Sequence, residues 1–383
     1  MVNPMLALRE IRIATTALLL VHGLIHLMGF LKPWKITAVP QLSGRAIVPL
    51  SDGAFRVIGV MWLIAAGAFV AAALLRLMDR ESWWLIAVPA IVLSQMLIIL
   101  QWGDAWAGTL ANVLLAVAVA LGAGTQQFHE VNLQHARGLL AKAPAGEPPI
   151  LRSEDIDKLP PPVQRWLEAS GAVGRPRAGT VRLVQRGGLR TAPDQRYMPA
   201  AAKQYFIVDE PGFVWTVDVT MMRVIPVVGR DTYINGRGRM FIKAGGLVTV
   251  ADGTGPKFDQ GTALRFLGEI IWFPSGALAS YITWEPIDGR RARATLTFKD
   301  VSVTADFEFD ERGRVVGMTA QRYFDGKTLE RWVIPIAEWK TIRGIEMPVR
   351  GSAIWKLAAG DFEYYQWEIL DVETNRTTLW DEE

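Results

Sequence analysis

The sequence predicts a membrane four-helix bundle followed by a mainly antiparallel β domain, either a curved sheet or an open half-barrel with one or two helices. Its first 125 residues contain four long stretches without a charged residue, whereas short runs after residue 150 alternate between apolar and polar residues. Such alternation is typical of strands with one buried face. We therefore divide the 383 residues into a four-helix transmembrane domain (1–125), a linker (126–152) and a β-rich soluble domain (153–383).

Each uncharged stretch has the length of a membrane span. A helix rises 1.5 Å per residue, so about 20 residues cross a hydrocarbon core of about 30 Å. Tryptophans lie at or near the ends of the stretches, at the level that indole rings prefer in a bilayer. The four stretches are Ile13–Leu31, Val57–Leu75, Trp83–Trp102 and Ala105–Ala123.

Composition excludes several classes of protein. The chain has no cysteine, which rules out disulfides, thiolate nucleophiles and cysteine-ligated metals. The formal charge is +3, and the excess of basic residues lies within the first 145 residues, which carry ten Lys/Arg and six Asp/Glu. The remaining chain is almost neutral and lacks the basic surface that nucleic-acid binding requires. We expect no nucleic-acid partner.

The pattern after residue 150 predicts two helical segments and many strands. Ser153 and Pro162 mark the starts of short helices, and Gly171 ends the second one. The runs 215–221, 292–298 and 301–309 alternate with period two, and hairpin signals such as Asn235-Gly236 separate the strands. Leu264, Leu267 and Ile271 follow a helical spacing within Thr262–Phe273, before Pro274.

The order of these features resembles a known but uncharacterised family. His-Gly-Leu-Ile-His in the first span and the segment Leu159–Leu167 at the start of the β domain are similar to an uncharacterised family of bacterial membrane proteins. The helical half resembles the layout of four-helix DoxX-like proteins, and the β half resembles the half-barrels of lipoprotein carriers. The resemblance implies a multi-pass protein of the bacterial inner membrane. The distribution of basic residues beside the spans weakly favours a cytoplasmic β domain, but it does not determine the side of the membrane on which this domain lies.

His22 and His26 are the most conspicuous polar pair. Their i, i+4 spacing places them on one helix face within the bilayer, where polar side chains are costly. They could ligate a metal or haem, or form a proton or quinone site with Gln95 and Asn112. The interpretation we favour is hydrogen bonding between helices by all four residues, at about 0.6 kcal/mol per bond. We expect neither a metal nor another cofactor.

The β domain contains few groups for ordinary catalysis. All four histidines precede residue 136, so a Ser-His-Asp triad, a Cys-His pair and histidine-ligated zinc are excluded from this domain. Arg265 and Glu269 stand four residues apart on the predicted helix and could form a buried ion pair at a cleft, although such pairs are more often solvated. Whether the protein is an enzyme stays open, and the residues favour a binding function.

Tryptophans are enriched in the β domain and could line a groove for a hydrophobic ligand. Indole rings supply broad apolar surface with one hydrogen-bond donor, which suits a lipid tail. The alternative is that these rings form the core. The candidate groove residues are Trp215, Trp272, Trp284, Trp332, Trp339 and Trp355.

Three functions follow from these features. The first is a non-enzymatic membrane-anchored protein whose β domain binds a lipid or another amphiphile. The second is an accessory or assembly subunit of a membrane redox or transport complex, with a membrane-protein partner. The third is a membrane enzyme that uses His22 and His26.

Overall fold

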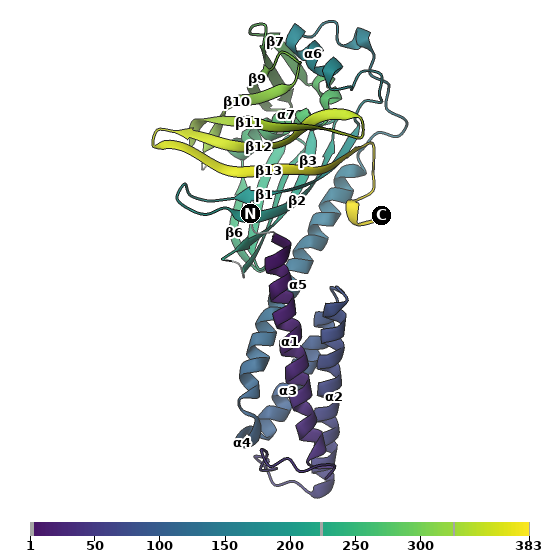
Figure 1. Cartoon of the computed structure of the whole chain (residues 1–383), viewed down its shortest axis with the longest axis vertical. Coiled ribbons are helices and arrows are strands. Elements are labelled where there is room, and N and C mark those ends of the chain that lie inside the picture. The colour runs from purple at the N-terminus through teal and green to yellow at the C-terminus, as the bar shows by residue number, and fades with distance from the viewer. Residues whose placement is uncertain (1–3, 223–224, 325, 383) are drawn as a thin grey trace. The chain divides into compact units, whose positions relative to one another are not determined.

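The structure, a computed structural model, describes residues 4–222, 225–324 and 326–382 (Figure 1). The chain divides into two compact units. One contains Met5–Phe128 with Gly245–Leu247, and we call it the helical unit. The other contains His129–Ala244 and the chain from Val248 onward, and we call it the β unit.

Within the described part of the chain, four helices are long and apolar enough to cross a membrane, as predicted. Small residues let the helices approach closely, since Ala65, Ala72 and Ala87 are completely buried. Trp62 and Phe69 fill the remaining space between the helices. The helices in the first 140 residues are α1 (Pro4–Leu31), α2 (Asp52–Leu77), α3 (Trp83–Leu100), the short α4 (Trp102–Ala105) and α5 (Gly108–Leu140).

Helix α5 is longer than the sequence predicted. It continues to Leu140, so the first half of the segment 126–152 is helical and does not form the linker that we expected. The reason is an apolar stripe that includes Ala136, Leu139 and Leu140, all of which are buried against the β unit's own strands. Burial of this stripe stabilises the helix beyond the last predicted span.

The β unit is a single curved sheet of 13 antiparallel strands, which confirms the predicted half-barrel. Strands β1 to β6 form one meander and β7 to β13 form another, and the pairing of β1 with β13 joins them. The strands are β1 (Thr180–Leu189), β2 (Met198–Ile207), β3 (Gly212–Met221), β4 (Ile225–Ile234), β5 (Arg237–Ala244), β6 (Val248–Thr254), β7 (Ile282–Pro286), β8 (Arg291–Phe298), β9 (Val301–Phe309), β10 (Val315–Phe324), β11 (Thr328–Ile342), β12 (Ile345–Leu357) and β13 (Gly360–Thr374).

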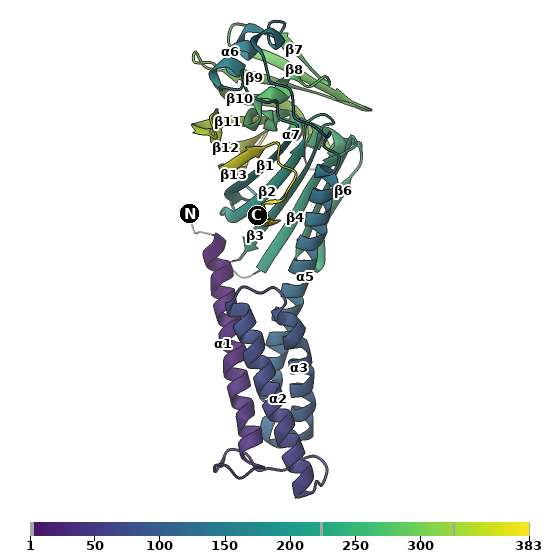
Figure 2. The same ribbon diagram turned by 90° about the vertical axis from the view of Figure 1, so that its right-hand side faces the viewer.

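Helix α7 (Pro256–Glu269) links the two edge strands, β6 and β7, and lies within the curve of the sheet (Figure 2). It contacts strands from both meanders, including β4, β5, β9 and β10. Leu264, Phe266 and Leu267 are fully buried in the main core, and Phe266 packs against Phe206 of β2. The single-turn helices η2 (Ile270–Trp272) and η3 (Pro274–Leu278) follow α7, and η1 (Ser153–Asp155) and α6 (Pro161–Ala169) precede the sheet.

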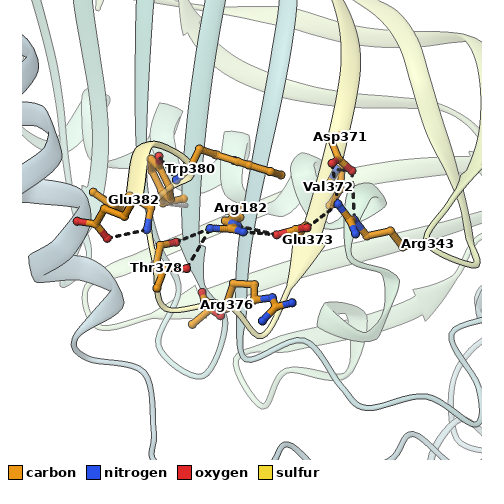
Figure 3. Close-up of polar contacts among 12 residues, drawn as sticks. Arg182, Arg343, Asp371, Val372, Glu373, Arg376, Thr378, Trp380 and Glu382 are labelled. Carbon is orange, nitrogen blue, oxygen red and sulfur yellow. Dashed lines mark hydrogen bonds and ion pairs between the residues drawn. The ribbon is translucent and has the colours of Figure 1, made fainter.

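Arg182 of β1, which is fully buried, binds the segment after β13 (Figure 3). Arg182 donates from Nε to Glu373 Oε2 at 2.8 Å and from Nη1 to the Thr378 carbonyl at 2.9 Å. Its guanidinium carbon also lies 4.4 Å from the ring centroid of Trp380, in the short helix η4 (Trp380–Glu382). An ion pair, a carbonyl, a hydroxyl and an aromatic face therefore all contact the Arg182 guanidinium.

Candidate functional site: an aromatic cavity in the half-barrel

The β unit contains a cavity of about 490 Å³ between the concave face of the sheet and the α7–η2 segment. Small-molecule sites in proteins have volumes of about 300–1,000 Å³, so the cavity can hold a ligand of ordinary size. Alternate residues on β3, β4 and β5 point toward it because side chains on a strand alternate between faces. Its aliphatic wall is made by Val217, Val219, Met221, Val227, Met240 and Ile242, with Val250 of β6.

Four of the six predicted groove tryptophans line this cavity: Trp215, Trp272, Trp332 and Trp355. They come from β3, η2, β11 and β12, so residues distant in the sequence are brought together. Trp367 of β13 also lines the cavity and meets Trp272 edge to face, with ring centroids 5.4 Å apart. Each of these five indoles is at least 93% buried, so the same rings form both the core and the cavity wall.

Trp284 and Trp339 do not line the cavity. Trp284 is on edge strand β7, where its ring packs 5.2 Å from that of Phe307 and its Nε1 donates to the Ala277 carbonyl at 2.9 Å. Trp339 lies on β11 after two register irregularities, and its Nε1 donates to the Val315 carbonyl at 3.0 Å. Trp339 is seven positions after Trp332, and an odd separation on a strand already favours opposite faces, so the two rings have different surroundings.

A polar cluster lies at the wall of the otherwise apolar cavity, centred on Arg265 of α7. Its Nε donates to Glu269 Oε1 at 2.7 Å, and its Nη1 donates to Asp231 Oδ2 of β4 at 2.8 Å. Gln204 of β2 donates to the other Glu269 oxygen at 2.6 Å. The Arg265 and Glu269 side chains are only 14% and 12% exposed. The predicted pair is therefore a buried one at a cavity, with a second carboxylate that the sequence did not reveal.

Burial and the arginine act on these carboxyl groups in opposite directions. Burial raises the pKa of Asp231 above its usual value, and the Arg265 charge opposes this increase. Burial likewise raises the pKa of Glu269, again opposed by Arg265 and by the hydrogen bond from Gln204. The cluster therefore depends on the arginine to keep two buried carboxylates charged.

Polar side chains from α1, α3 and α5 meet in a separate network inside the helical unit. His22 Nε2 lies 2.9 Å from Asn112 Oδ1, and His26 Nε2 lies 2.8 Å from Ser94 Oγ. Asn112 Nδ2 also donates to Ser94 Oγ and to Gln95 Oε1, each at 3.0 Å. The structure thus brings together all four predicted intramembrane polar residues, and Ser94 connects them. Within the described ranges, no group of three or more His, Asp or Glu side chains is placed to hold a metal.

We expect Asn112→Leu to destabilise the helical unit more than Gln126→Leu on the same helix. Asn112 joins three side chains, whereas Gln126 accepts one bond, from Trp84 Nε1 at 2.7 Å. At about 0.6 kcal/mol per bond, the expected losses in unfolding free energy are about 2 and about 0.6 kcal/mol. Thermal unfolding of the full chain in a mild detergent measures both, and equal losses would contradict a joining role for Asn112.

Residues 149–367 match a family model described as a family of unknown function, DUF6544. The chain belongs to the DUF6544 family. The match begins just before η1 and covers the sheet as far as the middle of β13, including the cavity-lining tryptophans. The comparisons give no support to the DoxX-like layout, and the chain matches none of the curated proteins.

The solved structures that are similar to this DUF6544 protein include the following two. One is a LolA superfamily protein from Nitrosomonas europaea, with 13% identity and a TM-score of 0.34, covering 57% of this chain and 96% of the other. The second is a putative outer membrane lipoprotein-sorting protein domain from Vibrio parahaemolyticus, with 11% identity and a TM-score of 0.32, covering 53% and 88%. At these scores, we infer nothing about a ligand or an activity from either likeness.

Proposed function

We propose that this DUF6544 protein is a membrane-anchored binding protein whose β unit holds the hydrophobic part of a lipid or similar amphiphile. The observation that carries the proposal is the 490 Å³ cavity, whose wall combines five tryptophans with Val, Met and Ile side chains. An apolar concave site with a few polar groups at one place is the usual form of a site that binds and orients an amphiphilic molecule.

The four apolar helices support the anchoring part of the proposal. In this model of function, the helices span a bacterial inner membrane and keep the binding domain close to a source of lipid. Exposed apolar side chains are frequent along the long helices, for example Leu24, Val57, Leu85 and Leu114. Side chains of this kind are stable when they face hydrocarbon and costly when they face water.

The test uses the full chain in a detergent-free amphipol and a bromine-labelled twelve-carbon fatty acid. Bromine quenches tryptophan fluorescence at short range, and five of the chain's 15 tryptophans line the cavity. We expect saturable quenching in the unaltered protein. The double substitution Val227→Phe with Ile242→Phe adds bulk at two half-buried positions of the cavity wall. It should weaken binding at least tenfold, or about 1.4 kcal/mol.

Leu370→Phe is the matched control for added bulk. Leu370 lies on β13, is 47% exposed and does not line the cavity. Binding by this variant should equal that of the unaltered protein, and all variants should keep the same far-UV circular dichroism. Two results would contradict the proposal: quenching that never saturates, or equal affinity in the control and the double variant.

A further inference from the structure

Arg322 of β10 lines the cavity without a carboxylate partner. In the described residues, no Asp or Glu oxygen lies within 4.0 Å of its guanidinium nitrogens, and its side chain makes one hydrogen bond, from Nη1 to Tyr364 Oη at 3.3 Å. Its guanidinium carbon lies 4.7 Å from the ring centroid of Trp332 and 5.6 Å from that of Trp355. A guanidinium has five N–H donors, so most of the hydrogen-bonding capacity of Arg322 is unused by these contacts.

The surroundings of Arg322 differ from those of Arg265 in the same cavity. Arg265 has two carboxylates at hydrogen-bond distance, so its charge is compensated within the wall. Arg190, the residue that follows β1, also lines the cavity, and its side chain donates to the carbonyls of Glu363 and Pro193 rather than to a carboxylate. The charged residues of the lining are three arginines and two acids, which leaves a net charge of +1 when all are ionised.

A guanidinium in a mostly apolar wall without a carboxylate in direct contact is costly unless something else completes its hydrogen bonds. Aromatic faces attract a cation, but a bidentate pairing with an anionic oxygen group provides more stabilisation and a defined geometry. Arg322 therefore adds a planar set of donors to the lining of a cavity whose aromatic and aliphatic side chains are suited to a hydrocarbon tail. A ligand that satisfies both features has an anionic head and an apolar tail.

We propose that the cavity selects amphiphiles with an anionic oxygen head group, a carboxylate or a phosphate, and that Arg322 is the residue that pairs with it. This inference rests on the proposed function, because it concerns the head of the ligand whose tail occupies the aromatic wall. The competing role for Arg322 is structural: its charge acts on Asp231 at longer range and could simply balance the polar cluster.

Four probes with the same twelve-carbon tail separate these roles: laurate, dodecyl phosphate, dodecanol and dodecyltrimethylammonium. Each competes with the brominated fatty acid for the full chain in amphipol. We expect laurate, dodecyl phosphate or both to bind at least tenfold more tightly than the neutral and cationic probes. Comparison of the two anionic probes shows which head the site prefers. Arg322→Gln should lower the affinity for the anionic probes to about that for dodecanol, and Arg322→Lys should restore part of the difference.

Arg331→Gln is the control, because Arg331 is an exposed residue of β11 that does not line the cavity. Its head-group preference should match that of the unaltered protein. Equal affinity for all four probes in the unaltered protein would overturn the inference but leave the proposed function intact. Loss of binding for every probe in Arg322→Gln, together with a lower melting temperature, would make Arg322 a structural residue and also overturn it. Failure of the unaltered protein to bind any probe would refute the proposed function itself.

Discussion

Arg265→Met is expected to lower the unfolding free energy of the β unit by about 3 kcal/mol at neutral pH, because it leaves two buried carboxylates without their cation. Asp231 and Glu269 both lie within 2.8 Å of the guanidinium, and their side chains are 20% and 12% exposed. Methionine fills a similar length but compensates neither charge. Thermal and urea unfolding of the full chain in a mild detergent measure the loss.

The loss should depend on pH in a defined direction. The pKa of each carboxyl is already raised by burial, and Arg265 opposes the increase, so removal of Arg265 raises both pKa values further. A carboxyl whose folded-state pKa is raised stabilises the fold below its unfolded pKa, and this stabilisation is lost as the pH rises through the folded pKa. The deficit of Arg265→Met should therefore shrink as the pH falls from about 7.5 to about 5.

A triple variant tests the same electrostatic cause without a change of pH. Combining Arg265→Met with Asp231→Asn and Glu269→Gln removes the unpaired charges and should recover much of the lost stability at neutral pH. If the deficit of Arg265→Met is independent of pH and unaffected by the two amide substitutions, lost packing rather than charge is its cause.

Local patterns predicted the elements of this fold well. The alternation of residues 301–309 is reproduced by β9, in which Val301, Val303, Ala305, Phe307 and Phe309 are buried and the residues between them are more exposed. Asn235 and Gly236 both adopt positive φ in the turn between β4 and β5, as their sequence predicted. Period and turn chemistry depend on neighbouring residues, and a single sequence displays them directly.

Features that depend on distant contacts were not predictable in this way. The pairing of β1 with β13 joins residues almost 200 positions apart, and no local pattern indicates it. The extension of α5 depends on contacts of Leu139 and Leu140 with Tyr205 and Val214 of the sheet. Leu133, Ala136 and Leu140 are three and four residues apart, a spacing typical of a helix. Polar residues surround them, so the segment did not match the pattern of an uncharged span.

In the candidate site, too, contacts between near neighbours in the sequence were predictable and contacts between distant residues were not. The i, i+4 spacing placed Arg265 beside Glu269, whereas Asp231 joins them from a strand 34 residues earlier. In the helical unit, His22 and Asn112 were conspicuous because such polar side chains are rare in a span, but Ser94 was overlooked because small hydroxyl residues are common there. Arg322 was missed for a different reason. A single arginine in a strand gives no sign of a binding role until the structure shows that no carboxylate contacts it.

Arg182→Met should cost about 3–5 kcal/mol of unfolding free energy, the usual range for breaking a buried ion pair. Arg182 is completely buried, and its loss removes the partner of Glu373 and the donor to the Thr378 carbonyl (Figure 3). Arg343, whose side chain is 55% exposed, still contacts Glu373 and retains part of the compensation. We therefore expect the lower end of this range.

Arg186→Met is the matched control, because Arg186 lies on the same strand and also forms an ion pair with a glutamate. Arg186 is 55% exposed and pairs with Glu368, so its loss should cost less than about 1 kcal/mol. Hydrogen exchange adds a local readout, since the backbone N–H of Asn375 donates to the Thr180 carbonyl and that of Trp380 to Tyr205 Oη. These amides should exchange faster in Arg182→Met than in Arg186→Met, because the segment after β13 loses its buried attachment to β1. Equal stability losses in the two variants, with unchanged exchange at these amides, would mean that the remaining contacts of residues 375–380 hold the segment in place without Arg182.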